Sequence, residues 1–200
     1  FNAECEPVGM MGTVQDITAR KEAEEALRLK EARHRQLLDG LGEGVFGVDP
    51  QGRFTFLNRA ARQMLGLARE AEVLGEPSHA VAHHSDAAGH PYPESECPIL
   101  QVAEGAEAPP AWEDRFFRAG GEGFPVEVHA APLTGEDGEP DGAVVSFRDV
   151  TERHRLEAAR NQLVAILEAT PDYVAIADAD GSLCYLNRGG RELLGLPLSA

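Results

Sequence analysis

The sequence predicts an α+β fold, in which a five-stranded antiparallel sheet carries short helices on one face and is flanked by coiled-coil-like linker helices. The first observation is an internal repeat: residues 37–67 and 166–196 align without a gap, and eleven aligned pairs are identical, Asn58/Asn187 among them. Such a repeat defines the architecture before any local pattern is considered. The second observation is the order of the apolar patterns, which runs strand, strand, short helices and then three strands.

A second repeat gives the predicted domain organisation. Asp16-Ile17-Thr18 recurs as Asp149-Val150-Thr151, and each copy precedes a run of strong helix formers. We therefore expect both ends to be cuts through a longer protein. The predicted parts are listed in chain order: the end of a preceding domain at 1–18, a linker helix at 19–36, a complete domain at 37–151, a second linker helix at 152–165 and the start of a following domain at 166–200.

The first half of the complete domain is predicted as a hairpin followed by a capped helix. Strands are expected at 44–49 and 53–57, joined by a Pro-Gln-Gly turn. Asn58 then caps a short helix at 59–65, which Gly66 ends. A further helical turn is expected within 68–75, followed by an irregular stretch at 76–97.

The second half is predicted as one helix and three strands. The helix occupies 98–104 and begins at a proline, which suits the first turn. Strands are expected at 112–118, 124–133 and 143–147. The middle strand alternates, with Val126, Val128 and Ala130 on the face that should be buried.

The two linker helices carry apolar residues at spacings typical of a coiled coil. A short two-stranded coiled coil is therefore predicted, and an exposed helix without a partner is the alternative. The predicted dimer seam consists of Leu27, Leu37, Leu41, Leu156, Leu163 and Ile166.

Charge and composition argue against several partners. The chain carries 34 acidic and 18 basic residues, a net charge of −16. Such a surface repels nucleic acids and anionic membranes. No apolar run of about 18 residues is present, so no membrane contact is expected in this segment. The three scattered cysteines suggest free thiols in a reducing compartment, and we expect a cytoplasmic location.

Three stretches in order, GVFGVDPQGRFTFLNRAARQMLGL, GEGFPVEVHAAPL and GAVVSFRDVTER, resemble the PAS sensor domain with its C-terminal PAC segment. The flanking repeats look like the end of a preceding PAS domain and the start of a following one. The resemblance implies a sensory module in a multi-PAS bacterial signalling protein of the histidine kinase or diguanylate cyclase type. It also implies parallel homodimers, with neighbouring PAS domains and a downstream effector in the same chain. No catalytic residues and no kinase phosphoacceptor box are found, so an enzyme is not expected within these 200 residues.

Cofactor chemistry stays open. The reactive-cysteine motif of flavin photosensors is missing, and the helix that carries the ligating histidine in haem PAS domains reads PILQVAEG here, so flavin and haem are not expected. A loop holding His79 and then His83, His84, His90 and Cys97 contains metal-ligand types. The irregular spacing of these residues argues against a bound metal. If a metal is bound, the candidate ligands are His83, His84, His90 and Cys97.

Two further sites are predicted in the complete domain. The space between sheet and helices is the family's ligand site, and its predicted lining is Val48, Phe56, Met64, Leu74, Ile99 and Val128. Apolar residues at such spacing are more often plain core. Asp149 and Thr151 lie where the last strand meets the linker helix. We expect Thr151 to cap that helix and Asp149 to hold the junction through hydrogen bonds or an arginine.

The sequence thus supports three functions. The first is a sensory and relay module that binds a small ligand or passes conformational change through its linker helices. The second is a ligand-free dimerisation and spacer module. The third is a haem- or metal-binding redox sensor built on the histidine loop.

Overall fold

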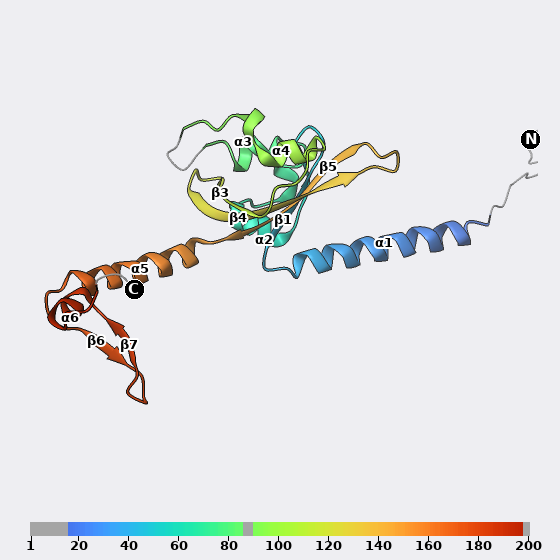
Figure 1. Cartoon of the computed structure of the whole chain (residues 1–200). Coiled ribbons are helices and arrows are strands. Elements are labelled where there is room, and N and C mark those ends of the chain that lie inside the picture. The colour runs from blue at the N-terminus through green and yellow to red at the C-terminus, as the bar shows by residue number, and fades with distance from the viewer. Residues whose placement is uncertain (1–15, 86–89, 198–200) are drawn as a thin grey trace, which may run out of the picture.

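A computed structural model describes residues 16–85 and 90–197 of the chain (Figure 1). Its elements follow the predicted order, and a second, two-stranded sheet follows the five-stranded one. They are α1 (Thr18–Asp39), β1 (Gly44–Val48), β2 (Phe54–Leu57), α2 (Arg59–Leu65), η1 (Glu70–Glu72), α3 (Ser78–Ala82), η2 (Glu94–Glu96), α4 (Pro98–Ala103), β3 (Trp112–Phe117), β4 (Gly123–Thr134), β5 (Pro140–Asp149), α5 (Thr151–Ala169), β6 (Ala175–Ala177), β7 (Leu183–Leu186) and α6 (Arg188–Leu193).

The central sheet has the strand order β2-β1-β5-β4-β3, and every neighbouring pair is antiparallel. Helices α2 and α4 pack on one face of this sheet, so the predicted α+β class is confirmed. In β4, Val126, Val128 and Ala130 are fully buried, whereas Glu127 and His129 between them face outward. The alternation predicted from sequence therefore separates the core face from the outer face.

Four phenylalanines, one each from β1, β2, β3 and β5, form the aromatic part of the core. The Phe46 ring lies 5.2 Å from that of Phe54 and 5.9 Å from that of Phe147, and Phe116 lies 5.0 Å from Phe147. All four are buried. Burial of one such side chain stabilises the fold by about 1.5–3 kcal/mol, so this cluster binds strands β1, β2, β3 and β5 into one unit.

Several helices differ from the prediction. A five-residue helix, α3, occupies part of the stretch expected to be irregular. Both linker helices run beyond their predicted ends, to Asp39 and Ala169. Leu41, assigned to the dimer seam, lies past the end of α1, because the helix terminates at Gly40.

Asn58 joins three elements through one buried side chain. Its Oδ1 accepts hydrogen bonds from the amides of Val45 in β1 and Ala61 in α2, at 2.9 and 2.8 Å. Its Nδ2 donates to the carbonyls of Leu38 and Glu43, both at 2.9 Å. The predicted helix cap is confirmed, and the same side chain also holds the end of α1 beside the start of the sheet.

The second copy of the repeat uses the same device. Asn187 accepts from the amides of Val174 and Gly190, at 2.9 Å each. Its Nδ2 donates to carbonyls at the end of α5, including that of Leu167 at 2.9 Å. The identity of these two asparagines in the repeat therefore has a physical cause, since only an amide supplies an acceptor and two donors at one point.

Replacement of this side chain should be costly. We predict that Asn58→Ala lowers the free energy of unfolding by about 2–4 kcal/mol, because it removes a helix cap and leaves buried backbone groups without partners. Asn58→Asp should also destabilise the chain, because a carboxylate cannot donate to the carbonyls of Leu38 and Glu43. Chemical denaturation measures both effects. Gln63→Ala, an exposed change on the same helix, is the control and should stay within about 0.5 kcal/mol. A cost below about 1 kcal/mol for Asn58→Ala would contradict the assigned role.

Candidate functional site

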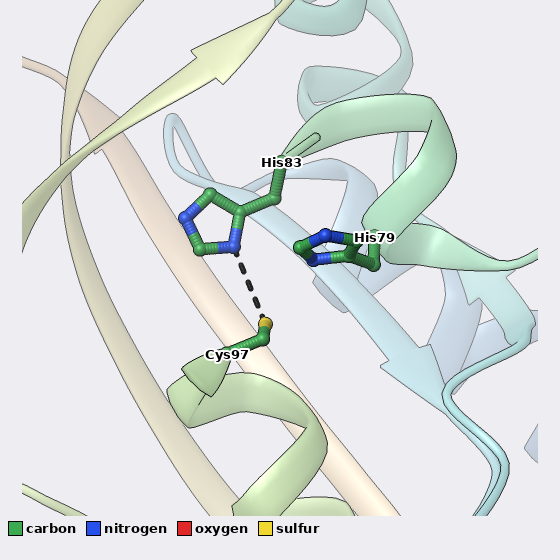
Figure 2. Close-up of side chains that lie close together, drawn as sticks. All are labelled: His79, His83 and Cys97. Carbon is green, nitrogen blue, oxygen red and sulfur yellow. Dashed lines mark hydrogen bonds between the residues drawn. The ribbon is translucent and has the colours of Figure 1, made fainter. Parts of the chain in front are cut away.

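Two histidines and a cysteine meet in the interior beside the sheet (Figure 2). His79 lies in α3 and His83 caps its C-terminus, so the two are one helical turn apart and share a face. Cys97 immediately precedes α4, whose first residue is Pro98. His79, His83 and Cys97 are 6%, 2% and 0% exposed, and one ligand atom from each lies within 4.8 Å of the other two.

His83 connects the thiol to a carboxylate on the sheet. Its Nδ1 lies 3.3 Å from Cys97 Sγ, and its Nε2 lies 2.9 Å from Asp114 Oδ2 in β3. Burial alone would lower the pKa of His83, but the interactions with Asp114 and Cys97 outweigh it and raise the pKa to about 9. With no ion bound, the ring is therefore an imidazolium held between Asp114 and Cys97 at neutral pH.

Asp114 is itself fixed by its surroundings. Burial would raise the pKa of this carboxyl, but the contact with His83 and the hydrogen bonds from the Arg115 amide and the Trp112 indole lower it. The indole Nε1 of Trp112 donates to Oδ2 at 3.0 Å. The carboxylate thus stays ionised and points at His83.

His79 presents an unsatisfied nitrogen. Its Nε2 lies 2.8 Å from the carbonyl oxygen of Tyr92. A carbonyl only accepts, so Nε2 carries the proton and Nδ1 is left with a free lone pair. Within the described part of the chain, Nδ1 is buried and has no hydrogen-bond partner. A buried lone pair of this kind calls for an explanation.

Aromatic rings line the cluster. The His83 ring lies 4.8 Å from that of Tyr92 and 5.6 Å from that of Phe116, a member of the aromatic core. The two histidine rings are 5.6 Å apart and nearly perpendicular. The cluster is therefore an extension of the core in which three polar groups replace apolar ones.

The structure places some histidines of the predicted loop in the buried cluster and others outside it. His83 and Cys97 come together, and His79, which is not among the predicted metal ligands, joins them. His84 is exposed, with its ring stacked 4.4 Å from Phe117 and its Nδ1 bonded to Ser85, and His90 also lies outside the cluster. The i, i+4 spacing of His79 and His83 is the signal that could have revealed the pair, had a helix been predicted there.

The predicted cavity lining has mixed outcomes. Val48, Ile99 and Val128 are buried in the core, and Met64 packs partly buried against it. Two assignments are wrong. Leu74 is 43% exposed, and Phe56 lies on the outer face of the sheet. An extra residue in β2 opposite Gly47 and Val48 shifts the register, so that Phe54 takes the core position instead.

The strand-to-helix junction at the start of α5 is built around Asp149. Its Oδ1 accepts from the amide of Thr151 at 2.9 Å, and its Oδ2 accepts from Arg118 Nη2 at 3.2 Å. Burial would raise the pKa of Asp149, but the hydrogen bonds from Thr151 and the guanidinium of Arg118 outweigh it and lower the pKa. Arg118 also donates to the carbonyl of Met64 in α2 and lies over the ring of Phe124 at 4.1 Å.

The assignment of Thr151 as the cap is corrected. Val150 occupies the cap position, and the carboxylate of Asp149 accepts the amide hydrogen of Thr151 instead. The same arrangement starts α1, where Asp16 accepts from the amide of Thr18 at 2.9 Å. The repeated Asp-x-Thr sequence is therefore a helix start in which aspartate supplies the capping oxygen.

A second set of contacts links the sheet to α5. Glu113 in β3 forms an ion pair with Arg153, and its carboxylate also lies 2.9 Å from Nε2 of His154. Its neighbour Asp114 faces His83, so adjacent residues of one strand contact the buried cluster and the linker helix. A groove of about 540 Å³ lies along this strand, between Tyr92 and His154.

The remaining seam residues are exposed on the two linker helices: Leu27 (58%), Leu37 (63%), Leu156 (63%), Leu163 (63%) and Ile166 (56%). Within residues 16–85 and 90–197, no helix combines the length and hydropathy needed to cross a bilayer.

Comparisons with known proteins identify the family. Residues 32–150 match the model described as PAS fold, and residues 161–200 match one described as PAS domain. The chain is 31% identical over 156 residues to the probable diguanylate cyclase DgcE of Escherichia coli, covering 78% of this chain and 14% of that protein. It is 30% identical over 149 residues to the C4-dicarboxylate transport sensor protein DctS of Rhodobacter capsulatus, covering 73% of this chain and 22% of that protein.

Among solved structures, an RNA-binding light-oxygen-voltage receptor superposes with a TM-score of 0.53 at 22% identity, covering 70% of this chain and 38% of that one. This likeness shows the fold alone. The chain spans less than a quarter of the length of the two curated relatives described above. The family match covers more than half of the 200 residues, and the chain belongs to the PAS domain family.

Proposed function

We propose that the complete domain is a sensory and relay module, which passes a change in its sheet and buried cluster to the start of helix α5. The observation that carries this proposal is the position of Asp149. One carboxylate there binds the first turn of α5 and Arg118, and Arg118 in turn binds α2. Movement of β3, α2 or β5 would therefore shift the direction in which α5 leaves the domain.

The contacts of Glu113 with Arg153 and His154 give a second connection. They join the first turn of α5 to β3 at a point next to Asp114. They are half-exposed, so each is worth little in stability. Weak and exposed contacts suit a relay, because a junction that must adopt two states cannot be locked by strong ones.

The effector is proposed by analogy with the relatives. One of them is named as a diguanylate cyclase and the other as a transport sensor protein, and both are several times longer than this chain. We propose that the longer protein carries a kinase or cyclase output domain, with α5 leading through the following PAS unit towards it. A cytoplasmic location stays a prediction from the cysteines.

A substitution at the junction tests the relay. We predict that Asp149→Asn changes the basal output or the signal response of the full-length protein at least threefold, since it removes the charge that binds Arg118. Asp141→Asn, an exposed change on the same strand, is the control. Enzymatic output is measured together with circular dichroism to confirm folding. Unchanged output and response in a folded Asp149→Asn protein would refute the relay.

Dimer formation is the second part of the proposal. Leu156 and Leu163 lie seven residues apart and are each 63% exposed in the single chain. Apolar residues at heptad spacing on a helix are stabilised by a second copy of the same helix. We propose a parallel homodimer joined through α5, with Leu27 and Leu37 of α1 extending the contact.

Charge placed in the seam should separate the dimer. We predict that Leu156→Glu combined with Leu163→Glu raises the dimer dissociation constant at least tenfold, because two carboxylates per chain would be buried without partners. Sedimentation equilibrium measures the constant. Leu133→Glu, at an exposed leucine on β4, is the matched control and should leave it unchanged. A wild-type chain that stays monomeric, or a double variant as dimeric as wild type, would exclude this seam.

A further inference from the structure

We propose that His79, His83 and Cys97 form a binding site for one divalent transition-metal ion of the zinc class. The site stands independently of the relay function, because it rests on the buried cluster alone. Three donors of the types that zinc prefers lie within 4.8 Å of one another, and all three are buried. Two are nitrogens and one is sulfur, a set that favours zinc or a similar ion over magnesium or calcium, which take oxygen ligands.

The spacing of the donors fits tetrahedral coordination. With Zn–N and Zn–S bonds of about 2.0–2.1 and 2.3 Å, neighbouring ligand atoms of a tetrahedron lie about 3.5 Å apart. His83 Nδ1 and Cys97 Sγ are already 3.3 Å apart. Figure 2 shows the His79 ring turned towards this pair, so small side-chain rotations would complete three corners of the tetrahedron.

Each histidine has the outer contact that a metal ligand requires. A ligating ring uses one nitrogen for the metal and donates from the other to a carboxylate or a carbonyl. In His83, Nε2 lies 2.9 Å from the Asp114 carboxylate, an ion-pair distance without the alignment of a hydrogen bond, and Nδ1 faces the site. In His79, Nε2 bonds to the Tyr92 carbonyl at 2.8 Å, which leaves Nδ1 as the free donor.

The unpartnered nitrogen is the observation that a purely structural role does not explain. A buried polar atom without a hydrogen bond costs about 1–3 kcal/mol. His79 Nδ1 is such an atom, in a side chain that is only 6% exposed. Coordination of an ion would satisfy it. Three protein ligands leave a fourth position for water or an exogenous ligand.

Titration with the metal alone tests the site. Cys5→Ser and Cys184→Ser first remove the other two cysteines. The resulting full chain, stripped with a chelator, should bind one Zn²⁺ by calorimetry and by native mass spectrometry. With Co²⁺, it should show a thiolate-to-metal charge-transfer band together with the visible bands of a tetrahedral ion. The proposal would be overturned if this chain bound no more Zn²⁺ than the same chain carrying both His79→Gln and Cys97→Ser.

Matched variants locate the ion. Cys97→Ser should abolish the charge-transfer band, and His79→Gln should weaken Zn²⁺ binding beyond the ~10–100-fold expected for an outer contact. His84→Gln changes the adjacent, exposed histidine and should leave affinity unchanged. Far-ultraviolet circular dichroism of each variant controls for unfolding. If a variant fails to fold, the charge-transfer band of the Cys5→Ser, Cys184→Ser chain still tests the site, because Cys97 is the one thiol in that chain. Binding that persists in folded Cys97→Ser and His79→Gln chains would refute this ligand set.

Asp114 is assigned as a positioning residue. Asp114→Asn keeps the shape but removes the charge that orients the His83 ring, so Zn²⁺ affinity should fall about 10–100-fold while the stoichiometry stays at one. The Co²⁺ charge-transfer band should persist with lower occupancy, because the thiolate still ligates. Unchanged Zn²⁺ affinity in this variant would show that Asp114 does not position a ligand. The substitutions of His79 and Cys97 would then test the ligand set by themselves.

Discussion

The amide of Asn58 is the constraint on which the arrangement of this domain depends. It sits where the incoming helix, the first strand and the first short helix converge, and its hydrogen bonds join all three. A hydrophobic core is non-directional and would not fix the angle at which α1 meets the sheet. Four directional hydrogen bonds from one buried group do so. Asn187 repeats the solution in the following unit, which explains why both copies keep this residue.

The buried cluster depends on two features of this framework. The short helix α3 places His79 and His83 on one face, and the start of α4 places Cys97 opposite them. Strand β3 then contributes Asp114 from the sheet side. Because Glu113 is the neighbouring residue and contacts α5, the edge of the sheet next to the cluster is also the edge next to the exit helix. A sensor needs this proximity, since a ligand shifts an equilibrium only through contacts that differ between its two states.

The strands, the capped helix and the alternation of β4 could be predicted from sequence because each has a local physical signal. The repeated asparagine marks a cap, proline marks the first turn of α4, and the valines of β4 alternate with polar residues. The errors lie where the signal is not local. The bulge in β2 places Phe54 in the core and Phe56 on the outer face, and the apolar pattern of the sequence does not reveal a bulge. Helix α3 is only five residues long, too short for a periodic pattern, so the sequence does not reveal the pairing of His79 with His83. Asp114 lies 31 residues from His83, and only the folded sheet brings the two together.

Hydrogen–deuterium exchange of the first turn of α5, with and without Zn²⁺, tests most directly whether the buried cluster and the exit helix are coupled. An ion held by His83 would fix Asp114 and the adjoining part of β3, and through Glu113 it would slow exchange of the amides at 153–156. The account predicts this added protection in the wild-type chain and its loss in Cys97→Ser. Identical exchange rates at α5 in a wild-type chain that holds one Zn²⁺ would contradict the coupling, and would leave the cluster as a metal site without a role in the relay.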